Sequence, residues 1–99
     1  MHRLRCGVIY TNAFAEYLAQ LERSRPQART IIALDYVRCT AGQNQAKEWW
    51  KVEWMPEHRA PDDCRFTIGN TPVCLSRQSQ RGLKHRCIDW RDGQVVVKS

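Results

Sequence analysis

The sequence predicts an α+β fold, specifically a compact, mainly β sandwich or partial barrel with a mixed sheet, one N-terminal amphipathic helix and one further short helix. Short runs of apolar and β-branched residues recur along the chain, separated by Gly, Pro, Asn and Asp, which is typical of short strands. Only one segment, near the N-terminus, carries a sustained helical period. Because 99 residues suffice for one domain, we expect residues 1–99 to fold as a single unit.

The N-terminal helix is predicted between a capping residue and a proline, after a short apolar entry at 8–10. Thr11 or Asn12 caps this helix, because either side-chain oxygen can accept a free N–H of the first turn. Pro26 stops it, since proline cannot continue the hydrogen-bonding pattern. The apolar residues recur three or four positions apart and form one stripe: Phe14, Tyr17, Leu18 and Leu21.

The best strand covers Thr30–Cys39, and a polar segment at 40–47 reads as a loop after it. Both faces of this strand are largely apolar, so we expect it to be covered on both sides. A second strand is predicted at 48–55, where tryptophan and valine alternate with charged residues. Prolines and charges at 56–63 predict a connection.

A β-hairpin is predicted next. Gly69-Asn70 supports a tight turn between strands at Arg65–Ile68 and Thr71–Leu75. Pro72 has no N–H to donate, so we place its strand near a sheet edge. Alternation along the strand turns Cys74 away from its apolar neighbours, towards solvent or the other face of the sheet.

The chain then returns to a helix and two short strands. Residues 76–83 form one or two helical turns with Ser76 as the cap. Strands at 86–90 and 95–98 follow, joined across a turn at Asp92-Gly93.

The strand at 86–90 has one apolar and one polar face. Its alternation places Ile88 and Trp90 inward. The same alternation places Cys87 and Asp89 outward. We therefore expect Asp89 to contact solvent.

The chain is basic, with 16 Lys and Arg against 10 Asp and Glu, a net charge of +6. This excess favours an anionic partner, either nucleic acid or an acidic protein surface. A patch in the last quarter of the chain could neutralise several phosphates, with binding that weakens steeply as salt rises. A solvated face that only aids solubility is the alternative. The patch consists of Arg77, Arg81, Lys84, Arg86 and Arg91.

Five cysteines leave room for metal or redox chemistry: Cys6, Cys39, Cys64, Cys74 and Cys87. No signal peptide or membrane-spanning run is evident, so we expect a cytoplasmic protein with free thiols and no membrane partner. Phosphate-binding glycine loops, the nucleophile elbow, paired Cys-x-x-Cys and the metalloprotease motif are all absent from the sequence. We therefore expect no enzymatic activity.

A zinc site would use four residues of the C-terminal half: Cys64, Cys74, His85 and Cys87. Their thiols and imidazole suit tetrahedral zinc. The spacing argues against zinc, because structural sites usually offer two close pairs and only His85 and Cys87 lie close together. Buried thiols that pack as small apolar groups are the simpler interpretation.

Several short stretches follow one another along almost the whole chain in an informative order. They are Ile9-Tyr10-Thr11-Asn12-Ala13, the strand 30–37 leading into Arg38-Cys39-Thr40-Ala41-Gly42, Val52-Glu53-Trp54, Pro61-Asp62-Asp63 with Phe66, Pro72-Val73, Ser76 to Leu83, and Ile88-Asp89-Trp90. This ordered set resembles the HesB/IscA-like A-type iron–sulfur carriers. Each stretch by itself is a weak signal, and the specificity lies in their order.

The resemblance implies a compact, mainly β fold and a role in iron–sulfur cluster assembly or transport, with an iron–sulfur cluster or iron as the cofactor. It carries over Cys39 as a ligand. A [2Fe–2S] cluster generally needs four protein ligands. The remaining ligands would come from Cys64, Cys74, Cys87 or small thiols, and a homodimer would supply a second Cys39. Partners would be iron–sulfur assembly or recipient proteins.

The sequence departs from that family at three places, the first of which is a loop after Cys39 that is several residues longer, through Thr40–Glu48. Arg38 stands where the family has a glycine before its first cysteine. The family's C-terminal Cys-Gly-Cys has no counterpart, because no cysteine follows Cys87. We therefore expect a divergent carrier, degenerate in its ligands, with Cys39, Cys64 and Cys87 as candidate metal ligands. A small basic binding module remains the alternative.

Overall fold

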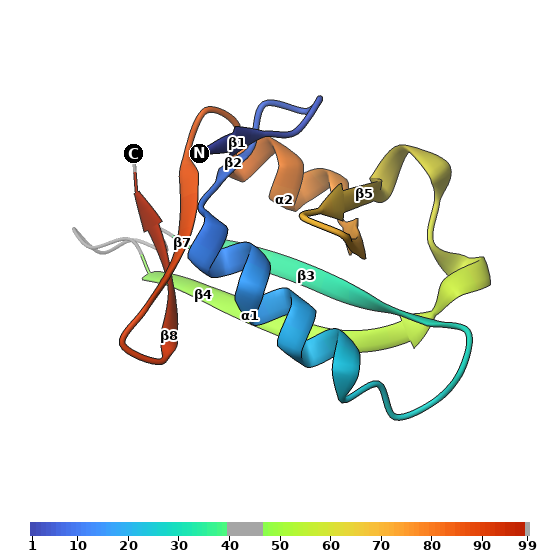
Figure 1. Cartoon of the computed structure of the whole chain (residues 1–99). Coiled ribbons are helices and arrows are strands. Elements are labelled where there is room, and N and C mark those ends of the chain that lie inside the picture. Colours follow the sequence, from blue (N-terminus) through green and yellow to red (C-terminus); the bar gives the residue numbers. More distant parts are fainter. Residues whose placement is uncertain (40–46, 99) are drawn as a thin grey trace.

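A computed structural model describes residues 1–39 and 47–98, and Figure 1 shows how their helices and strands are arranged. The expected α+β class is confirmed in this part of the chain, which is mostly strands in two mixed sheets with two α-helices. The predicted loop at 40–46 lies outside the described residues. The elements are β1 (His2–Arg3), β2 (Ile9–Tyr10), α1 (Asn12–Arg23), β3 (Thr30–Cys39), β4 (Lys47–Pro56), the 3₁₀ turns η1 (Glu57–Arg59) and η2 (Asp62–Cys64), β5 (Arg65–Ile68), β6 (Thr71–Leu75), α2 (Arg77–Gly82), β7 (Cys87–Arg91) and β8 (Gln94–Lys98).

Helix α1 confirms the predicted amphipathic helix and selects one of its two candidate caps. The Thr11 oxygen accepts a hydrogen bond from the Phe14 N–H at 3.2 Å, and the helix ends at Arg23, before Pro26. Phe14 and Leu18 are fully buried, as the apolar stripe predicts. Within residues 1–39 and 47–98, no helix has the length and apolar character needed to cross a membrane.

The first sheet has the strand order β1-β2-β7-β8. Strands β2 and β7 are parallel, and the other two pairs are antiparallel. The β7–β8 hairpin turns at Asp92 and Gly93, which have φ angles of 51° and 77°. Positive φ at both central residues suits the twist of a tight hairpin, which explains the Asp-Gly signal in the sequence. The two-residue strand β1 was not predicted.

The second sheet has the order β4-β3-β6-β5. Strand β3 pairs with β4 along its whole length, from Thr30 opposite Pro56 to Cys39 opposite Lys47. On its other side β3 pairs with β6 only from Ile32 to Leu34, in parallel. Beyond that point the described strand neighbour of β3 is β4 alone, so the two strands continue as a long ribbon.

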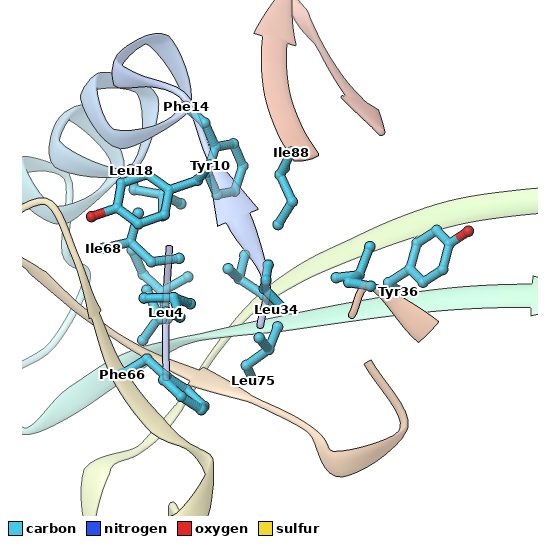
Figure 2. Close-up of a cluster of buried hydrophobic side chains, with 14 residues drawn as sticks. Leu4, Tyr10, Phe14, Leu18, Leu34, Tyr36, Phe66, Ile68, Leu75 and Ile88 are labelled. Atoms are coloured by element: carbon cyan, nitrogen blue, oxygen red, sulfur yellow. The ribbon is translucent and has the colours of Figure 1, made fainter. Parts of the chain in front are cut away.

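One hydrophobic core joins the two sheets and α1. Tyr10 and Ile88 come from the first sheet, whereas Leu34 and Ile68 come from the second, and Figure 2 shows them gathered around the α1 residues. Helix α1 crosses β3 and β4 in Figure 1, and the Phe14 and Trp50 rings lie 6.4 Å apart between their centroids. The fold therefore buries most of its apolar surface in a single interior.

Helix α2 is attached to β3 by a buried serine. Ser76 caps the helix as predicted, since its oxygen accepts from the Ser79 N–H at 3.2 Å. The Ser79 hydroxyl oxygen in turn accepts the Tyr36 N–H at 2.9 Å. This bond satisfies a main-chain donor of β3 at a position that β6 does not reach.

The expectation that β3 is covered on both faces holds only in part. Its inner face, at Ile32, Leu34 and Tyr36, is buried in the main core. On the outer face Ile31 is buried in a smaller cluster, but Asp35 is only half-buried. The η1–η2 segment packs on the outer face of β3 only near the start of the strand, where it forms the smaller cluster with Ile31. Asp35 lies further along the strand and is therefore less covered.

One sequence-based placement is confirmed and one is wrong. Strand β6 lies near a sheet edge, as expected, because its neighbour β5 is the edge strand. Pro72 pairs with β5 but precedes the stretch of β6 that pairs with β3, so no N–H is needed there on the β3 side. Asp89 is not outward and solvated but 6% exposed, because Thr11 packs over it.

Candidate functional site

Cys39, the ligand that the family resemblance singled out, is the last residue of β3. Its backbone pairs with Lys47 at the end of the β3–β4 ribbon. Its side chain lies outside what the structure describes, so the thiol ligand stays a prediction. The ribbon nevertheless fixes the backbone position, five residues beyond the last β3 residue that pairs with β6.

Cys64 and Cys87, the other two candidate metal ligands, have different surroundings. Cys64 ends the η2 turn and is buried in the smaller cluster under the second sheet. Cys87 begins β7 in the first sheet, and its Sγ lies 3.7 Å from the Met1 sulfur. Among the described residues no group of three or more His, Cys, Asp or Glu side chains gathers as a metal site.

The structure does bring Cys64 together with Cys74. Both thiols belong to the smaller buried cluster, and both line a pocket of about 400 Å³ on the outer face of the second sheet. Most of the pocket lining is apolar, with Asp35 and Arg77 among its polar side chains. Cys74 therefore points to the other face of the sheet, one of the two placements that strand alternation allowed.

Burial governs the acidity of both thiols. It raises the pKa of Cys64, and the neighbouring Asp63 carboxylate raises that pKa further, whereas Arg77 lowers it. Burial likewise raises the pKa of Cys74, with an added rise from Cys64 and a lowering from Arg65. Both groups are therefore protonated, weakly nucleophilic thiols at neutral pH.

The predicted basic patch does not act as one free surface, because three of its five members have partners. Arg77 forms an ion pair with Asp63, with 2.6 Å between Nη2 and Oδ2. Arg91 donates from Nε to Asp89 Oδ2 at 2.9 Å. Arg86 donates from Nη1 to the Tyr36 hydroxyl at 2.7 Å.

The remaining two members lie together at the end of α2. Arg81 and Lys84 are exposed, and with Arg77 and the half-buried Cys6 they line a hollow of about 320 Å³. Gln80 completes the lining. An anion would meet three cations here, one of them already paired with a carboxylate.

Sequence reasoning missed the pocket shared by Cys64 and Cys74. The hairpin centred on Gly69-Asn70 was predicted, and its register places Arg65 opposite Cys74, on the same face of the sheet. Strand alternation alone would turn the residue before Arg65 to the opposite face. Cys64 instead ends the η2 turn, which the sequence did not predict, and it lies in the same buried cluster as Cys74.

The zinc set considered from the sequence is divided between two places. Cys64 and Cys74 share the pocket. His85 instead follows α2, where its backbone N–H donates to the Gly7 carbonyl at 2.9 Å. Cys87 lies in the first sheet.

Comparison of the chain with protein-family models, with curated proteins and with solved structures finds no match.

Proposed function

We propose that this protein is a non-enzymatic carrier of iron or of an iron–sulfur cluster, with Cys39 as its protein ligand and a divergent HesB/IscA-like fold. The observation that carries the proposal is the position of Cys39 at the end of the β3–β4 ribbon. There the described strand neighbour of β3 is β4 alone. A second copy of the chain could approach this end without displacing a strand of its own sheet.

The ligand count shapes the proposed complex. A [2Fe–2S] cluster generally takes four ligands, mostly thiolates. Cys64 and Cys74 are buried in one pocket and Cys87 lies in the other sheet, so a homodimer would offer two Cys39 thiolates. Two small thiols such as glutathione would complete the set. The cargo would pass to or from iron–sulfur assembly or recipient proteins in the cytoplasm.

The arrangement of two motifs adds support. Thr11 belongs to the first stretch that carries the family resemblance and Asp89 to the last, and their side chains are hydrogen-bonded at 2.7 Å. The fold therefore brings the first and the last of these stretches into direct contact.

Anaerobic reconstitution with ferrous iron and sulfide, with and without glutathione, tests the proposal. Visible absorption should develop only with glutathione and coincide with dimer formation in size-exclusion chromatography. Cys39→Ser should abolish the absorption, and Cys87→Ser is the matched control that should retain it. A colourless wild-type protein contradicts the carrier function, and a coloured Cys39→Ser variant contradicts the assigned ligand.

A small basic binding module is the second candidate, favoured by the hollow at Arg81 and Lys84. Its affinity for mixed-sequence DNA or RNA would fall as salt rises, and removing one phosphate contact would lower the slope of log K against log salt by about 1. Arg81→Gln should show this change, whereas Arg91→Gln removes a cation that Asp89 already neutralises. Undetectable binding at low salt rules this candidate out.

A further inference from the structure

Three sulfur-containing residues are among those that line the pocket on the outer face of the second sheet. Cys64 contributes a thiol from η2, Cys74 a thiol from β6 and Met55 a thioether from β4. Both cysteines are buried, and Met55 packs against the cluster that contains them. None of these three residues is Cys39, the proposed iron ligand, so the two proposals can be tested separately.

Strand pairing explains why residues so far apart in the sequence meet here. Arg65 lies opposite Cys74 in the β5–β6 hairpin, and the η2 turn that ends at Cys64 comes directly before it, so Cys64 joins the cluster that contains Cys74. Ile31 lies opposite Met55 in the β3–β4 pair, and directly opposed residues point to the same face. Ile31 also contacts the cysteine cluster, so it links Met55 to the two thiols.

The donor set is chemically selective. Thiolate and thioether sulfur are soft ligands that favour monovalent copper, whereas oxygen donors suit magnesium, calcium and manganese. Structural zinc takes four nitrogen, sulfur or carboxylate ligands, and no third His, Cys, Asp or Glu side chain joins these two thiols in the described residues. We propose that Cys64, Cys74 and Met55 form a binding site for a soft monovalent metal ion, Cu(I).

The charges around the pocket fit such an ion. Two thiolates and one Cu(I) leave a single negative charge in mostly apolar surroundings. Burial and the Asp63 carboxylate raise the pKa of Cys64, and Arg77 opposes this rise. Burial and Cys64 raise the pKa of Cys74, Arg65 opposes this rise, and the Asp35 and Asp63 carboxylates add to it. A bound Cu(I) supplies the positive charge that two thiolates need in these surroundings. The metal displaces both thiol protons, so its apparent affinity rises with pH.

The test is an anaerobic titration of the full chain with Cu(I) in the presence of bicinchoninate, a chromophoric Cu(I) chelator. The chain carries Cys39→Ser, so that binding at the ribbon end does not contribute. We expect one Cu(I) per chain to leave the chelator, with only sulfur neighbours in X-ray absorption. Failure to withdraw copper from the chelator overturns the site, as does an oxygen-dominated coordination shell.

Variants in the same background locate the ion. Cys64→Ser should weaken Cu(I) binding at least about tenfold, equivalent to 1.4 kcal/mol. Met55→Leu preserves side-chain volume at a half-buried position, so it tests the thioether in a folded protein. Cys87→Ser is the control and should leave the affinity unchanged. Unchanged binding in Met55→Leu or in Cys64→Ser overturns the three-sulfur site, and so does a loss in Cys87→Ser.

Discussion

The Thr11 hydroxyl donates a hydrogen bond of 2.7 Å to the Asp89 carboxylate, 78 residues away in the sequence. The same Thr11 oxygen accepts the Phe14 N–H that begins α1. One side chain therefore caps the helix and attaches it to β7. Asp89 also accepts hydrogen bonds from the Trp90 N–H and the Arg91 guanidinium, so its carboxylate is held from several sides.

Replacing Thr11 should destabilise the protein through both of its bonds. Thr11→Ala removes the helix cap, which costs about 1 kcal/mol, and also removes a donor to the buried Asp89 carboxylate. Thr11→Ser keeps the hydroxyl and should retain most of the stability. Urea unfolding measures the difference, and equal losses in the two variants would contradict the role of the hydroxyl.

Stability should fall in strong acid because of Asp89. The Thr11 hydrogen bond, supported by the Trp90 N–H and Lys98, lowers the pKa of Asp89 from 3.8 to about 2, although burial opposes this. A lowered folded-state pKa means that the stabilisation is complete above the unfolded-state pKa. It is lost as the pH falls through about 2.

Comparison with Asp89→Asn isolates that contribution. We expect the free energy of unfolding of the wild type to fall more steeply than that of Asp89→Asn as the pH is lowered from 3.8 to about 2. Thermal unfolding followed by circular dichroism across this range provides the measurement. Parallel pH profiles for the two proteins would show that Asp89 is not responsible.

Ser79 should be more important than its size suggests. Its hydroxyl is fully buried and accepts the Tyr36 N–H of β3. Ser79→Ala leaves that donor without its acceptor and should cost about 1–3 kcal/mol. Gln78→Ala, at the exposed neighbouring position of α2, is the control and should have little effect. Denaturant unfolding of both variants decides whether the buried bond anchors α2.

The two hairpin glycines should differ in their tolerance of alanine. Gly69 and Gly93 have φ angles of 64° and 77°, so a side chain at either costs about 1–2 kcal/mol. A Cβ on Gly69 would also lie 3.2 Å from the Ala15 Cβ of α1, whereas Gly93 has open space around it. Gly69→Ala should therefore reduce the melting temperature more than Gly93→Ala. The reverse order would contradict the packing of the β5–β6 turn against α1.

Local patterns in the sequence determined most individual elements of this fold. The stripe of Phe14 and Leu18, the caps at Thr11 and Ser76, and the turn glycines each act within a few residues. Helical period, capping and turn geometry depend on such short separations, so the sequence predicts them directly. The Thr30–Cys39 strand was predicted with its observed bounds because its apolar run is likewise a local pattern of consecutive residues.

Only the tertiary structure decided which elements became neighbours. Strand β2 pairs with β7 from the opposite end of the chain, which buries Asp89 under Thr11. Strand β5 covers the edge of β6, which makes Pro72 an interior-strand residue. The meeting of Met55 with the Cys64–Cys74 pair depends on two separate strand pairings. Such contacts depend on the register and order of strands across the whole chain, and alternation within one strand specifies neither.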